Sequence, residues 1–374
     1  MLNQNITISG CNIISSLGFT SKENFRNVLN GVSGLQFHSH DSAQPLALID
    51  KRQFDKSSFE NQLPETFSMF EKLCALSIKD ALSESSVKIN SEDSLIILAT
   101  TKGNIGMLES DNKRSESIHL WESARKVGEY FRVKNFPLVI SNACVSSVMA
   151  QVLALRMLNA GQYKNIVVCG ADLITDFVLK GFQSFKALSP AACRPYDLNR
   201  DGLSLGEGAG SIVFSIGQSE ALFDGVRGLS GASSNDANHI SGPSRTGDGL
   251  ANAIFSTLNQ ADVRPEFIST HGTATPYNDE MESKAINLTG LHEIPANSLK
   301  SYYGHTLGGA GVIETITTLL ALESSKAIGT LGHVEYGMAE KINLVVQTHD
   351  LVFNSFLKIA SGFGGCNAAI LFSK

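Results

Sequence analysis

The amino-acid sequence predicts an α/β protein in which two βα halves build a layered fold. The first observation is the length, because 374 residues exceed one ordinary hydrophobic core. The second is that short, fully apolar runs typical of buried strands, such as 95–101 and 165–170, alternate with segments of helical periodicity. The third is that the order of elements in residues 1–215 is repeated in residues 216–374, although the residues themselves show no repeat.

The first half is expected to alternate strand and helix up to residue 215. Residues 31–66 are polar and turn-rich and receive no assignment, and residues 103–134 are polar and helical in part. The predicted strands are 5–14, 95–101, 136–140, 165–170 and 211–215, and the predicted helices are 22–29, 68–83, 142–161 and a short one before Leu188.

The second half is expected to restart this pattern at residue 216. Its predicted strands are 225–230, 267–270, 295–299, 355–360 and 368–372, and its predicted helices are 249–259 and 311–322. In α/β folds of this kind reactive residues gather at the ends of strands. The polar residues that follow strands in this chain are therefore the first candidates for a site.

Composition excludes several classes of function. A net charge of -6 with scattered Lys and Arg gives no footprint for nucleic acid or anionic lipid. The N-terminus lacks a signal-peptide pattern and no apolar run approaches about 18 residues, so we expect a cytoplasmic protein without a membrane span. Six cysteines without a CxxC pair or zinc-ligand spacing predict free thiols and no structural metal.

Cys144 is the first candidate for catalysis. It lies in NACVSS, between the strand 136–140 and the helix that ends near Gly161. The N-terminus of a helix favours negative charge, so we expect this thiol to ionise readily and to act as a nucleophile. A cysteine among small residues can also simply fill the core.

Two histidines strengthen the catalytic interpretation. His271 lies in STHGTATPYND at the end of a predicted strand, and His305 lies in LKSYYGHTLGGAGVIE just before a predicted helix. A single histidine at a strand end is more often structural than catalytic. Two of them beside glycines that permit close backbone approach, in a chain that also holds Cys144, indicate a tight reactive pocket.

Five ordered motifs resemble the β-ketoacyl-acyl-carrier-protein synthases, condensing enzymes of the thiolase superfamily. The motifs are NACVSS, RPYDLNRDGLSLGEGAG, THGTATPYNDEME, LKSYYGHTLGGAGVIE and SGFGGCNA, and they run from about residue 140 to the C-terminus. The resemblance implies a thiolase-like fold of two duplicated βα halves with αβαβα layers. It also implies a decarboxylating Claisen condensation between an acyl group and a malonyl thioester.

The resemblance assigns roles to individual residues. Cys144 would carry the acyl group, while His271 and His305 would bind the malonyl thioester and stabilise its enolate. Phe363 would act as a gate, and its backbone N–H would form an oxyanion hole with that of Cys144. The supporting residues implied are Lys300 as a fourth catalytic residue, Glu314 and Asp279 as structural support, and Thr273 and Thr275 as ligands of pantetheine.

Partners and cofactors also follow from the resemblance. The substrates would carry phosphopantetheine on acyl carrier protein, and neither a metal nor another cofactor is expected. A homodimer, or a heterodimer with a synthase-like paralogue, is expected because apolar strands such as 165–170 often pair across two-fold axes in this family. The short interval between Thr101 and Cys144, and Ser361 where an aromatic residue is common, favour a polyene- or polyketide-type pathway with a widened acyl pocket.

Three alternatives stay open at this point. A non-decarboxylating thiolase would need a second catalytic cysteine, for which Cys366 is the nearest candidate in sequence. A chain-length-factor-like subunit, non-catalytic or weakly active within a synthase heterodimer, would normally lack the nucleophile. A papain-like protease would use one Cys–His pair with an orienting amide, and would leave His305 and Lys300 unexplained. Lys300 could also be a solvated surface charge.

Overall fold

The computed structural model describes residues 5–38, 44–109, 116–217 and 221–374 and shows a layered α/β fold. A ten-stranded sheet has the order β3-β2-β4-β5-β1-β6-β12-β11-β7-β8, and β9 and β10 form a small separate pair. The strands are β1 (Ile6–Ser15), β2 (Ser94–Ala99), β3 (Leu138–Ile140), β4 (Asn165–Asp172), β5 (Gly208–Ile216), β6 (Arg227–Asn235), β7 (Phe267–Ser269), β8 (Ala296–Asn297), β9 (Lys326–Ala327), β10 (His349–Asp350), β11 (Ser355–Gly362) and β12 (Cys366–Ser373).

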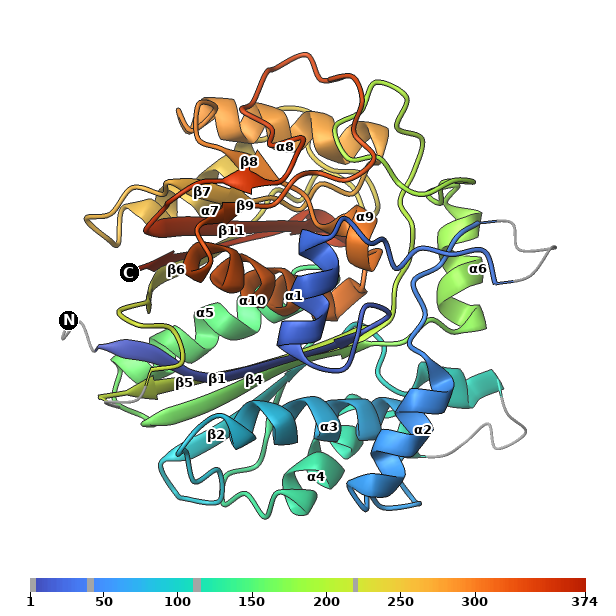
Figure 1. Cartoon of the computed structure of the whole chain (residues 1–374), viewed down its shortest axis with the longest axis vertical. Coiled ribbons are helices and arrows are strands. Elements are labelled where there is room, and N and C mark those ends of the chain that lie inside the picture. Colours follow the sequence, from blue (N-terminus) through green and yellow to red (C-terminus); the bar gives the residue numbers. More distant parts are fainter. Residues whose placement is uncertain (1–4, 39–43, 110–115, 218–220) are drawn as a thin grey trace.

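The helices cover both faces of the sheet and also fill the space between its two parts (Figure 1). The α-helices are α1 (Ser21–Leu29), α2 (Lys51–Glu60), α3 (Met69–Ser83), α4 (Leu120–Tyr130), α5 (Ser146–Asn159), α6 (Asp176–Ser184), α7 (Asp248–Leu258), α8 (Pro276–Leu288), α9 (Lys300–Tyr303) and α10 (Ala310–Glu323). Four short 3-10 turns lie at Ile105–Glu109, Glu116–Ile118, Leu307–Gly309 and Phe363–Gly365.

The strand order divides the sheet into two sets of five strands. The first set, β1 to β5, comes from residues before 217. The second set consists of β6, β7, β8, β11 and β12 and comes from residues after 226. The two sets meet where Thr7 of β1 pairs with Arg227 of β6. Figure 1 shows α3 and α4 outside the first set and α7 and α8 outside the second, with α5 and α10 between them. This is the predicted αβαβα layering.

The central helices α5 and α10 are buried because each packs against strands of both sets. Helix α5 contacts β4 on one side and β6 and β12 on the other, while α10 contacts β5 and β11. Neither helix has a strongly one-sided apolar face, which is what full burial between two layers requires. Both helices begin at the same end of the molecule, and the candidate residues gather there.

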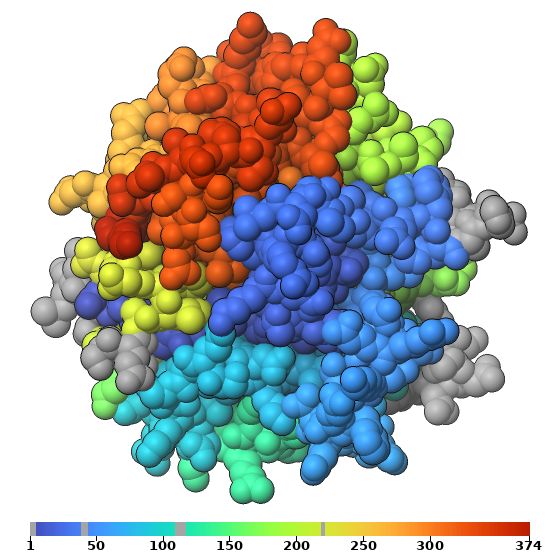
Figure 2. Space-filling view, in the orientation of Figure 1, coloured from blue at the N-terminus to red at the C-terminus, as the bar shows by residue number. Residues whose placement is uncertain are grey.

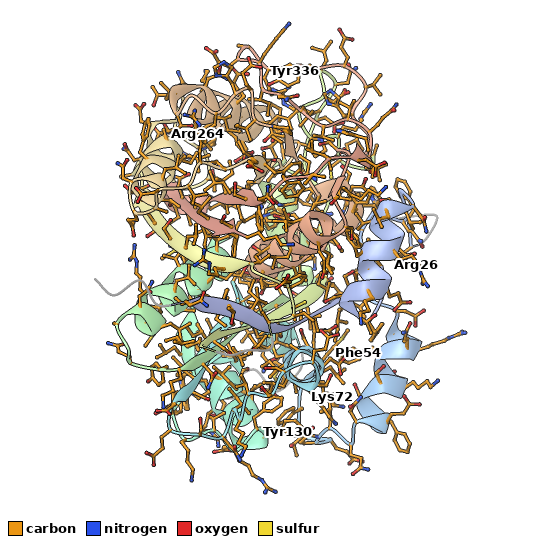
Figure 3. All side chains as sticks on the ribbon, turned by 60° about the vertical axis from the view of Figure 1, so that its left-hand side comes forward. Arg26, Phe54, Lys72, Tyr130, Arg264 and Tyr336 are labelled. Atoms are coloured by element: carbon orange, nitrogen blue, oxygen red, sulfur yellow. The ribbon has the colours of Figure 1, made fainter. Side chains whose placement is uncertain are left out.

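The N-terminal region packs across the junction of the two halves. In the space-filling view, residues of α1 and the following segment lie between the C-terminal half above and the α3 region below (Figure 2). Helix α1 contacts β1 and α10, and α2 lies against α3. Figure 3 shows Phe54 on the side of α2 that faces the protein interior, where its side chain is buried. Arg26 of α1 points away from the protein.

The structure corrects three expectations about elements. The strand 165–170 does not offer a free edge for a second chain, because β4 is paired with β2 on one side and β5 on the other. The free edge of this half belongs to β3. Two helices were missed: α2 lies in the unassigned region 31–66, and α8 lies in the THGTATPYNDEME motif, where Pro276 at its first turn marks the start. No helix among the described residues is long and apolar enough to cross a membrane.

Candidate active site

Cys144 lies in a strained turn between β3 and α5. The preceding residue, Ala143, has a φ of 45°, which an L-residue other than Gly rarely adopts. Ser146 stabilises this turn, because its Oγ accepts a hydrogen bond from the backbone N–H of Asn142 (2.8 Å) and donates one to the carbonyl of Ala143 (2.6 Å). This strained turn directs the Cys144 side chain away from α5 and toward the opposite half of the protein.

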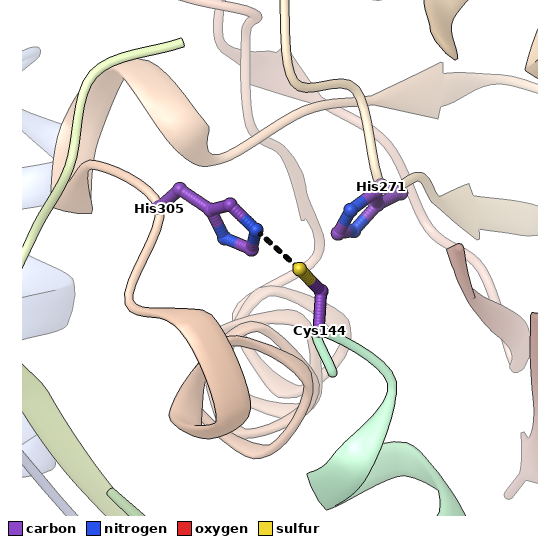
Figure 4. Close-up of side chains that lie close together, drawn as sticks. All are labelled: Cys144, His271 and His305. Atoms are coloured by element: carbon purple, nitrogen blue, oxygen red, sulfur yellow. Dashed lines mark hydrogen bonds between the residues drawn. The ribbon is translucent and has the colours of Figure 1, made fainter. Parts of the chain in front are cut away.

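The opposite half brings both histidines to this thiol. His305 Nε2 lies 3.0 Å from Cys144 Sγ, and the His271 ring lies edge to face with the His305 ring at a centroid distance of 5.2 Å (Figure 4). All three side chains are buried. Cys144 therefore meets two histidines that lie more than 120 positions later in the sequence, as the sequence predicted.

Burial determines the resting charges of these groups. It raises the pKa of the Cys144 thiol to about 11, although Lys300, Lys102 and the backbone N–H of Phe363 act in the opposite direction. The expectation of a thiolate favoured by the helix N-terminus is therefore wrong for the resting state, because desolvation outweighs the helix and its neighbours.

The histidines are uncharged for a related reason. Desolvation, and then the positive charge of Lys300, hold the pKa of His271 and of His305 well below 6.5. The resting pair is thus a thiol hydrogen-bonded to a neutral imidazole. In the tautomer that carries its proton on Nδ1, His305 Nε2 accepts the thiol proton, so His305 is placed to act as a base.

The His271 loop is held from two sides by buried charged groups. Glu282 of α8 accepts hydrogen bonds from the backbone N–H groups of His271 (2.6 Å) and Gly272 (2.7 Å), and from the Tyr196 hydroxyl (2.7 Å). Lys300 Nζ donates to the carbonyl of His271 (2.8 Å). Both sides of the His271 backbone are thereby fixed, which orients the imidazole.

Lys300 is buried and paired, so the surface-charge interpretation is wrong. It forms an ion pair with Glu314 of α10, and Glu314 also pairs with Lys358 of β11, whose Nζ lies 2.5 Å from Oε2. The side chains of the three residues are 1% (Lys300), 3% (Glu314) and 0% (Lys358) exposed. The predicted Lys300–Glu314 pair is present, and a second lysine joins it.

The His305 loop is held by close backbone contacts. The backbone N–H of His305 donates to the carbonyl of Ser204 (2.6 Å), and that of Gly206 donates to the carbonyl of His305. A Cβ at Gly206 would lie 2.0 Å from the carbonyl oxygen of Tyr303, so only glycine fits there. The loop after His305 is tied to β4 by Asp172, which accepts from the N–H of Gly308 (2.7 Å). The glycine-rich 202–210 segment thus serves the close approach of backbone to backbone beside His305.

The Phe363 loop closes over the nucleophile. A Cβ at Gly362 would lie 3.1 Å from the backbone nitrogen of Cys144, which shows how closely the two segments approach. The ring of Phe363 packs against Phe182 (centroids 5.8 Å apart) and edge-on against Phe185 (5.5 Å), both from the α6 region. These contacts place an aromatic cluster beside the thiol.

A cavity of about 430 Å3 connects the thiol to the surface. Its wall includes Thr273 and Thr275, whose hydroxyl oxygens lie 3.0 Å apart. Asp279 supports their turn from behind, since it accepts from the backbone N–H groups of Ala274 (3.2 Å) and Tyr196 (2.8 Å). Burial raises the pKa of Asp279 to about 7. The structure thus brings the residues to which the resemblance assigned roles to this cavity or to its immediate support.

Ser361 also lines the cavity, where its Oγ donates a hydrogen bond to Asn367 (2.8 Å). The Phe182 and Phe185 rings also occupy the wall near Phe363. Cys366 lies outside the cavity lining, and its thiol donates to Asn142 Oδ1 (2.8 Å), so it is not placed as a second catalytic cysteine.

The three central side chains also resemble a metal-binding set, because one ligand atom from each of Cys144, His271 and His305 lies within 4.8 Å of the others. Histidines that hold a resident metal usually donate their second ring nitrogen to a carboxylate or carbonyl. Here the Nδ1 atoms of both histidines have no partner among the described residues. This set therefore fits a resident metal poorly.

Sequence reasoning missed three supporting residues. Glu282 is recognisable in retrospect, because it lies one turn after Asp279 on the helix that follows the His271 motif. Lys358 stands alone among apolar residues in a predicted strand, which is itself a signal of a paired charge. Asp172 ends an apolar strand at the predicted reactive edge. The sequence therefore marks these three residues as unusual, but the groups that each of them binds are identified only by the fold.

Comparison with known proteins agrees with the predicted family, fold class and enzyme class. Residues 3–216 match the family model "Beta-ketoacyl synthase, N-terminal domain", and residues 226–333 match "Beta-ketoacyl synthase, C-terminal domain". The chain is 25% identical over 411 residues to 3-oxoacyl-[acyl-carrier-protein] synthase 2 of Staphylococcus aureus (strain COL), covering 100% of this chain and 99% of the relative. It is 26% identical over 418 residues to the protein of the same name from Synechocystis, covering 99% and 98%.

Solved structures show the same fold at low identity. One is a type II polyketide acyl-carrier protein in complex with its ketosynthase (AntDE:AntF), with a TM-score of 0.88, 20% identity and 99% of each chain covered. Another is the ketosynthase ApeO in complex with its chain length factor ApeC from Xenorhabdus doucetiae, with a TM-score of 0.85, 23% identity, and 99% of this chain and 98% of that chain covered.

The protonation state of Cys144 predicts how its alkylation depends on pH. Because the thiol has a pKa of about 11, the thiolate fraction and the rate of alkylation by iodoacetamide should rise continuously from pH 7 to pH 10. Peptide mass spectrometry resolves Cys144 from the partly exposed Cys366, which serves as an internal reference. A plateau of the Cys144 rate below pH 8 would show instead that the thiolate already dominates at neutral pH.

Proposed function

The chain belongs to the β-ketoacyl synthase family, and we propose that it is a catalytically active member that performs a decarboxylating Claisen condensation. In this reaction an acyl group held on Cys144 combines with a malonyl-acyl-carrier protein to give a β-ketoacyl-acyl-carrier protein and carbon dioxide. The observation that carries the proposal is the buried contact between Cys144 Sγ and His305 Nε2, with His271 beside it at the end of a cavity.

The first step is transfer of an acyl group to the enzyme. Cys144 Sγ attacks the thioester carbonyl while His305 Nε2 accepts the thiol proton, and the pantetheine thiolate leaves and takes that proton back as it departs. The backbone N–H groups of Cys144 and Phe363 hold the oxyanion, a role supported by the effect of the Phe363 N–H on the Cys144 pKa. His305 ends the step neutral, as it began.

The second step forms the carbon–carbon bond. The malonyl thioester loses carbon dioxide, and its electron pair is delocalised onto the thioester oxygen as an enolate. The N–H groups of the neutral His271 and His305 donate to that oxygen. The enolate carbon then attacks the acyl carbonyl on Cys144, and the cysteine thiolate leaves and takes up one proton from solvent, which balances the negative charge that the malonyl carboxylate brought. The thiol's raised pKa is compatible with this cycle because the thiolate is never the resting form. In acyl transfer His305 takes the proton as the sulfur attacks, and in condensation the departing thiolate is protonated again.

The substrate arm enters through the cavity. The paired hydroxyls of Thr273 and Thr275 on its wall support their role as hydrogen-bonding partners for the pantetheine amides. The steps above require this chain's own groups and one proton from solvent, so we propose that the chain uses neither a metal nor another cofactor. The acyl carrier protein delivers both substrates in this scheme.

We further propose a synthase-like partner and a specialised elongation pathway. Strand β3 forms one edge of the large sheet, and the neighbouring apolar side chains of Trp121, Phe136 and Leu138 are exposed. An open edge beside apolar side chains is a natural surface for pairing with another chain. The solved complexes of ketosynthases with chain length factors support a paralogue as that partner.

Acyl loading tests the nucleophile. Incubation with acyl carrier proteins bearing acyl groups of increasing length should add the mass of one acyl group to the intact protein. Cys144→Ala should abolish the adduct because no other thiol lies beside His305. Cys366→Ala, a matched cysteine replacement outside the cavity, should load normally. Loading that survives in Cys144→Ala would refute the assignment. If no donor loads even with the paralogue encoded nearby, the chain-length-factor alternative is favoured.

Replacing His271 should separate the two steps. His271→Ala removes an enolate donor but leaves the Cys144–His305 pair, so acyl loading should persist while condensation falls by about 100-fold or more, the usual effect of losing one preorganised donor. His305→Ala should impair both steps. Single-turnover mass spectrometry of loading and a malonyl-dependent product assay measure them separately. Equal losses of loading and condensation in His271→Ala would contradict this division of roles.

The exposed edge predicts the site of assembly. Leu138→Lys should weaken association because it places a charge on the β3 edge. Light scattering of the chain, alone and with the co-expressed paralogue, would then show a smaller species than for the wild type. Val334→Lys is the control, since Val334 is also exposed but lies far along the chain from β3. Unchanged assembly in Leu138→Lys would exclude this edge as the interface.

A further inference from the structure

The second buried lysine behind the histidines has no role in the reaction described above. Lys358 lies in the middle of β11 and is completely buried. Its Nζ donates to the carbonyls of Thr270 (2.8 Å) and Ser269 (3.3 Å) and pairs with Glu314 (2.5 Å). Removing an ammonium group from water is costly unless its partners compensate, so its presence calls for an explanation.

The two lysines act on adjacent parts of one backbone segment. Lys358 holds the carbonyls of residues 269 and 270, and Lys300 holds that of His271. Glu314 lies between the two ammonium groups and contacts both. With both lysines protonated, this Lys300–Glu314–Lys358 triad carries a net charge of +1. It lies behind the segment that presents His271 to the cavity.

Other titratable groups surround the same histidines. Cys144 from the α5 turn faces His305, and its thiol is neutral at rest. Glu282 and Asp279 of α8 bind backbone N–H groups behind the His271 loop, and burial raises the pKa of each. Asp172 of β4 holds the backbone after His305. The charged side chains that lower the pKa of both histidines are the two lysines.

We propose that Lys358 is a positioning residue of the active site, which fixes the His271 segment and, through the net positive charge of the triad, keeps His271 and His305 uncharged. An uncharged His305 is needed to accept the Cys144 proton, and the same positive charge stabilises an enolate in the cavity. The stabilisation of an enolate by the triad rests on the proposed function, whereas the effect of the triad on the charge of the two imidazoles does not.

The sign of the effect follows from charge. A nearby cation disfavours imidazolium, so the wild-type histidines stay neutral below the ordinary pKa of 6.5. Removing the charge of Lys358 lowers the triad to a net charge of zero and should raise both pKa values. Acyl loading, which requires neutral His305, should then lose activity at a higher pH than in the wild type. We expect a shift of about one pH unit, which is about tenfold in rate on the acid limb.

A charge series separates electrostatics from packing. Lys358→Met and Lys358→Gln both remove the charge, and the glutamine retains a donor for the Thr270 carbonyl. The double variant Lys358→Met with Glu314→Gln returns the net charge to +1 through Lys300 alone. Lys326→Met is the matched control, because Lys326 forms a surface pair with Asp350 (2.6 Å) outside the site.

Histidine titration by NMR on the full-length protein labelled with 13C in the imidazole rings measures the pKa values directly, with His271→Gln and His305→Gln spectra for assignment. We expect higher pKa values in both single Lys358 variants, near wild-type values in the double variant and no change in Lys326→Met. The acid limb of acyl loading should move in parallel.

Unchanged histidine pKa values in a folded Lys358→Gln would overturn the proposal and leave Lys358 a purely structural residue. A double variant whose pKa values match those of Lys358→Met would overturn it as well. If Lys358→Met fails to fold, Lys358→Gln and the double variant still decide the question. The titration requires no substrate, so the two proposals can fail separately. If the proposed function is wrong, the histidine pKa values still shift in the Lys358 variants, but the wild-type protein shows no acyl loading.

Discussion

Exclusion of water from Cys144, His271 and His305 is the constraint on which the rest of this site depends. Burial makes both the thiolate and the imidazolium costly, so the resting pair is neutral. Lys300, Lys102 and the backbone N–H of Phe363 favour the thiolate without overcoming this cost. In the mechanism we propose, charge therefore forms only transiently, on the cysteine during acyl transfer and on the thioester oxygen during decarboxylation. In a water-excluded site, fixed donors stabilise such transient charge more strongly than they could in water.

The layered fold creates this exclusion by bringing loops from both halves to one point. The Cys144 turn comes from the first half, and the His271, His305 and Phe363 loops come from the second. Their approach depends on missing side chains, because a Cβ at Gly206 or Gly362 would collide with backbone or crowd the nucleophile. The central helices α5 and α10, which contact strands of both sets, fix the relative position of these loops.

The sequence predicted the layers and the meeting of Cys144, His271 and His305 because both leave local signals. Apolar runs identify buried strands, and Cys144, His271 and His305 stand in glycine-rich segments at strand ends. The residues that hold these three side chains in place were less predictable. Lys300 and Glu314 were paired only by resemblance, and Lys358 and Glu282 act through backbone groups far away in sequence. The thiolate expectation was wrong because local position at a helix N-terminus says nothing about desolvation. The free edge was misassigned to 165–170 because apolar composition does not distinguish a central strand from an edge strand.

The unpartnered Nδ1 atoms give the neutral state a further consequence. In the mechanism we propose, His305 Nε2 accepts a proton during acyl transfer, whereas the same nitrogen donates one during decarboxylation, so the imidazole requires both tautomers in a single cycle. A carboxylate on Nδ1 would lock one tautomer, as in a Ser-His-Asp arrangement. Among the described residues no such group contacts Nδ1 of either histidine. The lysine triad acts on the imidazoles through charge rather than through a hydrogen bond. It can therefore disfavour the imidazolium while leaving the choice between the two neutral tautomers open.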